Sequence, residues 1–581
     1  MTTGRLVAAH ANIGRMPTRW NGSRSPVLLV GVSVAACLAT CRAPAAAAQS
    51  PVPIAPPQRS AAITTGEIDA HLRFLASDLL EGRAPGRRGG RLAAEYIASA
   101  LESAGVEPGW RGSYFQPVPI DVVTANHATM RASVEGRASA TLRDPADIVV
   151  WAGSATATSA AHGELVFVGY GVTAPEYRWD DYKGVDVRGK VLLMLVNEPP
   201  ATPTDPDLFD GPAMTYYGRW TYKFEEAERR GAVGALIIHT TADAGYPWHT
   251  VVSSWDAEQR LLPRDTALPP PLGIRGWITD SAATSLLAAA GLDLSTLRAR
   301  ASLRAFRPLP TGILVDLSFT NRVERVVADN VVGLVRGRDP AVRHEMVVFS
   351  AHWDHLGIGP PVDGDSIYNG AEDNASGVAD VLAIARAAAA SPHARRSLLF
   401  LFPTAEESGL LGSSYFVAHP PVPAADLVAD LNVDGGDLLG LTRDLGAVGE
   451  RKSSLGPALA RYARAHGMRV SADDHPEQGH FYRSDHFSFA RAGVPALSLG
   501  AGTDFVGRPD DWGKTQQAAY AAHRYHQPSD EYRPGVDLRG AVRLSQLVLG
   551  FGWAIADARA VPTWNAGGEF HRPTSRTAAQ P

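Results

Sequence analysis

Residues 346–355 read Met-Val-Val-Phe-Ser-Ala-His-Trp-Asp-His, a short apolar run followed directly by polar side chains. Such a run is typical of a buried strand. The same order recurs at 397–407 and at 427–434, and residues 378–390 between them have the pattern of a helix. Alternation of strand, loop and helix predicts an α/β fold, with a mostly parallel mixed sheet that helices cover on both faces.

Acidic residues and histidines stand just past the ends of the apolar runs. In a sheet of this kind ligands bind at the carboxyl ends of the strands. Each motif alone is weak evidence for a functional site, but we expect the motifs to meet along one edge of the sheet. The expected site residues are His352, Asp354, Asp373, Glu406, Glu407, Asp434 and His526.

The first of these motifs contains His352, Asp354 and His355. In an extended segment His352 and Asp354 point the same way. Asp354 can then accept from the imidazole N–H of His352 and leave the other ring nitrogen for a metal ion. His355 is expected to point elsewhere and to serve the structure.

Carboxylates of two further motifs suit a metal site. Asp373 lies in the small-residue segment Gly370–Gly377, where a carboxylate can approach an ion closely, although Asp-Asn-Ala-Ser taken alone is more typical of a helix N-cap. Glu406 and Glu407 follow a buried strand. Two adjacent carboxylates can divide roles, because one can bind a metal ion while the other takes a proton from metal-bound water.

The number of candidate ligands predicts two zinc ions per chain. A catalytic zinc ion takes about three protein ligands and keeps an open position. If Asp373 bridges, His352 and Asp434 complete one ion, and Glu407 and His526 complete the other. Glu406 is then left as general base.

Composition excludes several classes of function. The 581 residues include 45% hydrophobic and 20% charged residues, which is ordinary for a globular protein. A net charge of -5 offers no basic surface for nucleic acid. Both cysteines lie within the first 48 residues, which read as a leader, so the mature protein would have no cysteine for a disulfide, a metal ion or a nucleophile. No specific protein partner is predicted.

The amino-terminal residues predict export. Arginines precede the apolar stretch Pro26–Ala36, which is too short to span a bilayer stably. Cleavage after Ala45–Ala48 would leave a soluble periplasmic or secreted protein. Alternatively, Cys37 or Cys41 would be acylated and anchor a lipoprotein to the membrane.

Changes in residue pattern along the chain predict its division into domains. Residues 150–305 contain short β-rich runs, Pro-rich loops and one helix, Tyr222–Arg230, as expected of an inserted domain. The predicted parts are a leader at 1–48, the start of the α/β domain at 60–149, the insert at 150–305, the main part of the α/β domain at 306–560, and a flexible tail at 561–581.

Several motifs together resemble the co-catalytic zinc exopeptidases, which include bacterial leucyl aminopeptidases, aminopeptidase Y and glutamate carboxypeptidases. They are Ala-His-Trp-Asp, Gly-Ala-Glu-Asp-Asn-Ala-Ser-Gly, Glu-Glu, Asn-Val-Asp and Tyr-His-Gln-Pro-Ser-Asp, in the order of the family. The resemblance implies the metal pairing given above, Glu406 as general base and a cis peptide bond after Asp373. It also implies that Tyr525 stabilises an oxyanion and that Tyr482–Phe489 lines the substrate pocket.

The insert is similar to the protease-associated domain of secreted peptidases, because its helix is followed by Gly-Ala-Val-Gly-Ala-Leu-Ile-Ile-His at 231–239. This similarity implies a lid or a role in substrate access.

The predicted function is that of an exported zinc aminopeptidase, which hydrolyses peptides that have a free amino terminus. Two alternatives stay open: a carboxypeptidase or dipeptidase of the same fold, and a non-catalytic receptor or scaffold. Glutaminyl cyclases share the fold with a single zinc ion, whereas this chain retains ligands for a pair.

Overall fold

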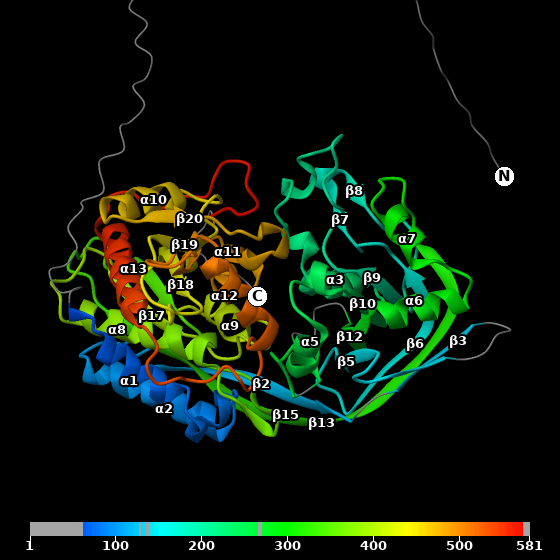
Figure 1. The fold of residues 1–581 in the computed structure, drawn as a ribbon, viewed down its shortest axis with the longest axis horizontal. Coiled ribbons are helices and arrows are strands. Elements are labelled where there is room, and N and C mark those ends of the chain that lie inside the picture. The colour runs from blue at the N-terminus through cyan, green and yellow to red at the C-terminus, as the bar shows by residue number, and fades with distance from the viewer. Residues whose placement is uncertain (1–61, 127–128, 135–139, 257, 265–269, 573–581) are drawn as a thin grey trace, which may run out of the picture. The chain divides into compact units, whose positions relative to one another are not determined.

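A computed structural model describes residues 62–572, apart from 127–128, 135–139, 257 and 265–269 (Figure 1). The predicted leader and the two cysteines lie outside the described residues, as do residues 573–581 of the predicted tail.

The region that carries the predicted site is built on four parallel strands. Their order in the sheet is β17 (Ser397–Phe402), β14 (Met346–Ser350), β18 (Leu427–Val433) and β21 (Ala496–Ala501). Antiparallel neighbours flank them, β13 (Leu309–Val335) beside β17 and β19 (Asp444–Val448) beside β21. The predicted mostly parallel mixed sheet is confirmed.

Helices cover this sheet on both faces, which explains why its central strands are apolar throughout. Because successive side chains alternate between faces, Val347 and Phe349 belong to one cluster of buried residues and Met346 and Val348 to another. The first cluster includes helices α1 (Thr65–Leu75), α2 (Arg88–Ser103), α8 (Gly377–Ala389), α10 (Leu455–Ala465) and α13 (Arg539–Asp557). The second includes α9 (Leu411–Ala418) and α11 (His486–Arg491).

A second region has a smaller sheet of similar construction. Its strands are ordered β5 (Ile148–Ala152), β12 (Ile274–Thr279), β10 (Gly234–His239), β9 (Val191–Leu195) and β6 (Thr158–Phe167). The last four are parallel to one another. Helices α3 (Trp220–Arg229) and α5 (Trp248–Trp255) pack on one face, and α6 (Asp280–Ala289) and α7 (Leu294–Ala301) on the other.

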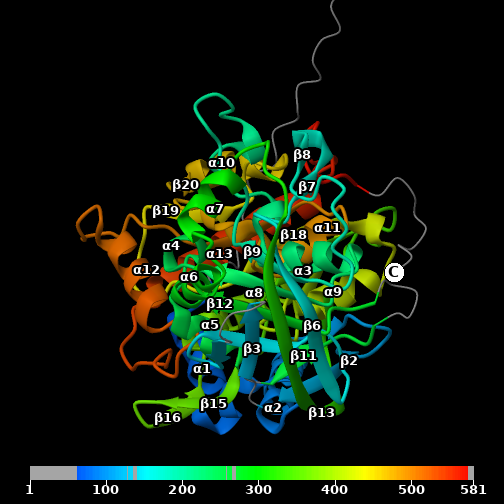
Figure 2. The same cartoon turned by 90° about the vertical axis from the view of Figure 1, so that its right-hand side faces the viewer.

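Strand β13 joins the two regions (Figure 1), and Figure 2 shows it beside β6. Its first part pairs with β6, its middle with β2 (Phe115–Ala125) and its end with β17. Strands β3 (Thr129–Val134) and β4 (Ala140–Arg143) also pair with the smaller sheet, although they lie before residue 150. The predicted domain boundaries stay a prediction.

The remaining elements are short or peripheral. They are β1 (Glu107–Pro108), β7 (Thr173–Ala174), β8 (Trp179–Asp180), β11 (Gln259–Leu261), β15 (Gly357–Val362), β16 (Asp365–Tyr368), β20 (Arg469–Ser471), α4 (Thr241–Ala244) and α12 (Trp512–His523). Among the residues described, none of the helices has the length and apolar character to cross a membrane.

The expectation of a single helix within 150–305 was wrong. Helices α4, α5, α6 and α7 also lie there. Segments 280–289 and 294–301 are rich in alanine and leucine, which are strong helix formers. The side chains of Thr279 and Asp293 cap them by accepting backbone N–H groups.

Candidate metal centre

The five predicted metal ligands converge, with Asp373 in the middle. The Nε2 atom of His352 lies 3.3 Å from Oδ1 of Asp373 and 3.2 Å from Oδ1 of Asp434. The Nε2 atom of His526 lies 3.3 Å from Oδ2 of Asp373 and 3.0 Å from Oε2 of Glu407. The two carboxylate oxygens of Asp373 therefore face two different pairs of side chains.

The spacing of these atoms fits zinc. Two ligands of a tetrahedral zinc ion lie about 3.3 Å apart, because Zn–N and Zn–O bonds are about 2.0–2.2 Å long. Nε2 of His526 is buried and has no hydrogen-bond partner among the described residues, although two carboxylate oxygens lie near it. A shared cation would satisfy these atoms. The assignment of the five residues as ligands stays a prediction.

Hydrogen bonds hold the loop of Asp373 against the loop of Asp434. The side chain of Asn374 donates to the carbonyl of Val433 over 3.0 Å and accepts from the backbone N–H of Gly435 at 3.0 Å. The peptide bond between Asp373 and Asn374 is cis, as the family resemblance implied. The backbone N–H of Asp373 also donates to Oδ2 of Asp530 over 3.1 Å, which ties this loop to the segment of His526.

His526 is positioned from the other side by the second region. It follows α12 in the left-handed backbone region, with φ of 57°. Its Nδ1 atom lies 2.8 Å from Oγ of Ser254 in α5. This contact directs Nε2 toward Asp373 and Glu407. Nothing in the sequence around Ser254 indicated it.

Glu406 lies beside the paired groups but farther from the histidine. Its Oε2 is 4.0 Å from Nε2 of His352, and its backbone N–H donates to Oδ1 of Asp354 over 3.0 Å. Burial raises the pKa of the Glu406 carboxyl well above its usual range. The Glu406 carboxylate therefore lies outside the two close pairs, and its role as general base stays a prediction.

The observed contact between His352 and Asp354 differs from the expected one in the atom that faces the histidine. Nδ1 of His352 lies 3.2 Å from the backbone carbonyl of Asp354 and 3.8 Å from its carboxylate Oδ1. The carboxylate instead accepts from Glu406. Asp354 therefore contacts both the histidine and the backbone of the predicted base.

His355 lies in the site, contrary to the expectation that it points elsewhere. It is fully buried, and its Nδ1 is 2.5 Å from Oε1 of Glu407. His355, Asp373 and Glu407 form one of the groups with spacing suitable for a metal ion. Residues 351–356 are not in a strand, so the alternation assumed for an extended segment does not apply.

Arg83 was not among the residues predicted for the site, because the sequence around it indicates only a turn between two helices. Its guanidinium is 1% exposed and donates to the carbonyls of Trp353 at 2.8 Å and Gly370 at 2.9 Å. It also donates to the carbonyls of Leu75 and Asn369. One side chain thus links the segments that carry His352 and Asp373.

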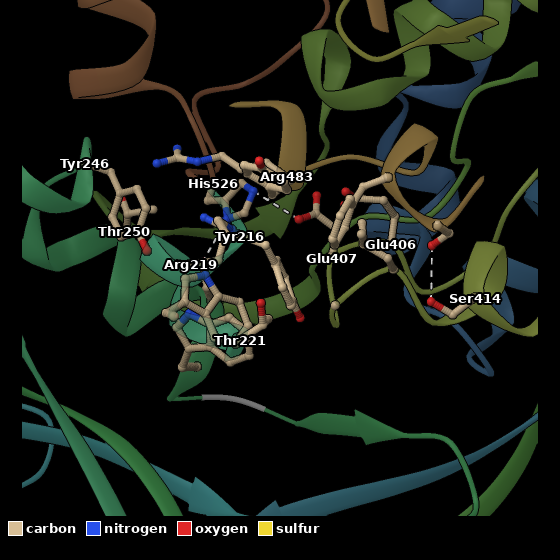
Figure 3. Close-up of a pocket in the computed structure, with 18 of the residues that line it drawn as sticks. Tyr216, Arg219, Thr221, Tyr246, Thr250, Glu406, Glu407, Ser414, Arg483 and His526 are labelled. Carbon is tan, nitrogen blue, oxygen red and sulfur yellow. Dashed lines mark hydrogen bonds and ion pairs between the residues drawn. The ribbon is translucent and has the colours of Figure 1, made fainter. Parts of the chain in front are cut away.

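A cavity of about 180 Å³ opens beside these groups (Figure 3). Glu406, Glu407 and His526 form part of its wall. Tyr525 also lines it, and burial raises the pKa of its hydroxyl well above the usual range, so the hydroxyl keeps its proton at neutral pH. Other lining residues come from the second region, including Tyr216, Arg219, Thr250 and Ser254, and from the predicted pocket loop, namely Tyr482, Arg483, Phe487 and Ser488. Gly409, Leu410, Ser414 and Arg491 of the first region complete the lining.

Comparison with known proteins finds similarity to peptidases. Residues 330–551 match the family model of Peptidase family M28. A probable leucine aminopeptidase 2 of Aspergillus oryzae is 35% identical over 108 residues, 19% of this chain and 19% of that protein. A probable lipoprotein aminopeptidase of Mycobacterium tuberculosis is 28% identical over 232 residues, 37% of this chain and 43% of that protein. The chain thus spans less than half the length of either relative.

Solved structures of aminopeptidases are also similar. An aminopeptidase from Aneurinibacillus sp. strain AM-1 has a TM-score of 0.49 and 18% identity, over 89% of this chain and 98% of that one. A zinc aminopeptidase from Bacillus subtilis has a TM-score of 0.44 and 18% identity, over 86% of this chain and 97% of that one.

Proposed function

We propose that the protein is an exported zinc-dependent aminopeptidase that binds two zinc ions and uses Glu406 as general base. One observation carries the proposal: each carboxylate oxygen of Asp373 faces its own histidine and its own second carboxylate. In this assignment His352 and Asp434 would hold one ion, Glu407 and His526 would hold the other, and Asp373 would serve both.

Zinc bound there would supply Lewis acidity toward the peptide carbonyl and lower the pKa of a nearby water molecule. Glu406 takes the proton of the attacking water and passes it to the leaving amine. Burial raises the pKa of the Glu406 carboxyl, which favours the form that holds the transferred proton. The protonated hydroxyl of Tyr525 donates toward the negative charge that develops on the carbonyl oxygen.

Cleavage at the amino end is favoured by the two aminopeptidases that share sequence with this chain. A carboxypeptidase or a dipeptidase would use the same metal-binding side chains. A non-catalytic receptor would have no need of a buried carboxylate at the position of Glu406.

The function is tested by comparing hydrolysis of leucine anilide with that of its amine-blocked form, before and after exhaustive chelation. We expect turnover of the free-amine substrate alone, loss of activity on chelation and recovery with zinc. Turnover of only the blocked substrate would overturn the aminopeptidase assignment.

Export rests on residues 1–48, which lie outside the described residues, and on likeness to a lipoprotein aminopeptidase. Expression of the full chain with labelled palmitate distinguishes a lipid-anchored protein from a soluble exported one. Label that is lost in Cys37→Ala or Cys41→Ala supports the anchor, and an unlabelled mature protein starting after Ala48 supports the soluble form.

The second region is proposed to act as a protease-associated domain that controls access of substrate. In support, it contributes lining residues to the cavity beside the metal groups. Its removal as a unit is a poor test, because β13 belongs to both sheets.

A further inference from the structure

Two arginines from different regions line the cavity beside the metal groups. Arg219 directly precedes α3 of the second region, and Arg483 directly follows Tyr482 in the loop before α11. Figure 3 shows both with His526, Glu406 and Glu407 around the same cavity. Neither arginine has a role in the reaction described above.

Arg219 is a buried cation that lacks an acidic partner. It is 8% exposed, its Nε has no hydrogen-bond partner, and no ion pair is found for it among the described residues. Burial, and then the charge of Arg483, lower the pKa of Arg219 to about 10, so it still carries its proton at neutral pH. A buried charge without a counter-charge is costly unless an anion approaches it.

Arg483 is held in place but its charge is not neutralised. It donates to the carbonyl of Ala244 over 2.8 Å and stacks on the ring of Tyr246, 5.4 Å from the ring centre. Its Nε also lacks a hydrogen-bond partner among the described residues. The guanidinium of Arg483 is therefore positioned by neutral groups, and its Nε donor is unused among the described residues.

A third arginine of the same cavity provides a contrast. Arg491 lies 3.5 Å from Glu225, so its charge is balanced within the protein. Among the residues that the structure describes, no such carboxylate pairs with Arg219 or Arg483. A guanidinium binds carboxylates through two parallel hydrogen bonds.

We propose that Arg219 and Arg483 form a carboxylate-binding subsite next to the metal centre, and that the enzyme prefers peptides that bring a carboxylate into it. This inference rests on the proposed function, because it takes the cavity as the peptide site. The carboxylate comes either from the free carboxyl end of a short peptide or from an acidic side chain next to the cleaved bond.

Pairs of substrates that differ in one carboxylate test the subsite. Leu-Gly is compared with its amide for the terminal carboxylate. Leu-Asp amide with Leu-Asn amide, and Glu-Gly amide with Gln-Gly amide, test acidic side chains on either side of the bond. We expect kcat/KM to favour the acid about 10- to 100-fold in at least one pair, the range for a charge-assisted hydrogen bond.

Substitution shows whether the arginines cause the preference. Arg219→Gln and Arg483→Gln should each reduce the preference about 10-fold or more, whereas Arg491→Gln should keep it. If Arg219→Gln does not fold, Arg219→Lys is measured instead, and it should retain part of the preference for the acid over the amide. Acid and amide hydrolysed within 2-fold in every pair would overturn the subsite, as would an unchanged preference in both glutamine variants.

Binding separates this inference from the proposed function. Calorimetry with the inactive variant Glu406→Gln measures the affinity for each acid and amide without turnover. Tighter binding of the acid that depends on Arg219 supports the subsite even if no peptide is cleaved. Equal binding rejects the subsite, and metal-dependent cleavage of the amides would then leave the proposed function intact.

Discussion

The two sheets joined by β13 have similar frameworks but different residues at their strand ends. Strands β14, β17 and β18 lead into segments with His352, Glu406, Glu407 and Asp434. In the second region, β9 leads into Val196 and Asn197, and β10 ends at His239. Buried parallel strands under helices therefore do not make a metal centre by themselves. The side chains at the strand ends decide the chemistry.

His239 illustrates the difference between the strand ends of the two regions. It is buried at the end of a parallel strand, as His352 is just after one, but its Nε2 lies 3.1 Å from the backbone carbonyl of Tyr246. Among the described residues, the groups suited to a metal ion all lie in the first region. The second region instead contributes walls and contacts, such as Ser254 on His526.

The largest effect is expected from Glu406→Gln, which separates proton transfer from metal binding. Turnover should fall about 100- to 10,000-fold, the usual contribution of a general base. Zinc content should stay at the level of the unchanged protein, whereas Glu407→Gln should lose zinc. Measured kcat and metal content check both, and loss of zinc from Glu406→Gln would show that this side chain is a ligand.

Arg83→Met tests how the segments of the first region are held together. Several buried carbonyls lose their donor, and each such loss costs about 1–3 kcal/mol, so stability should fall by about 3 kcal/mol or more. The matched control is Arg87→Met, because Arg87 is partly exposed and pairs with Glu258 at the surface. Chemical denaturation measures both variants, and equal midpoints would show that Arg83 contributes little to stability.

Asp354→Asn should weaken zinc binding about 10- to 100-fold, as expected for a residue that orients a ligand. His239→Gln in the second region serves as the control, and its zinc affinity should be unchanged. Competition with a chelator of known affinity provides the measurement. Equal affinity in Asp354→Asn and the unchanged protein would mean that Asp354 acts only on Glu406.

The smallest effect is expected from Ser254→Ala, which removes the contact of the second region with His526. Loss of one hydrogen bond costs about 0.5–1.5 kcal/mol, so zinc affinity should fall about 2- to 10-fold. Ser254→Thr, which keeps the hydroxyl, should restore most of it. If Ser254→Ala binds zinc as tightly as Ser254→Thr, the contact does not position the ligand.

Much of the first region could be predicted from sequence, because buried parallel strands are continuous apolar runs with polar residues at their ends. The observed strands β14 and β17 begin at Met346 and Ser397, where the stretches read from the sequence at 346–355 and 397–407 begin. The convergence on Asp373 was predicted from the order of residue types along one sheet edge.

Contacts between distant segments could not be predicted in this way. Ser254 reaches His526 across 272 positions of sequence, and Arg83 reaches Gly370 across 287. Neither residue has a local pattern that distinguishes it from a surface polar residue. His355 was misplaced because the chain leaves strand geometry directly after Ser350.

The most direct test of the account is a zinc titration of the metal-free protein, with bound metal and aminopeptidase activity followed together. The account predicts that two zinc ions bind per chain and that Asp373→Asn, which alters the shared carboxylate, weakens both. Full activity after exhaustive chelation, or two tightly bound zinc ions in Asp373→Asn, would contradict it.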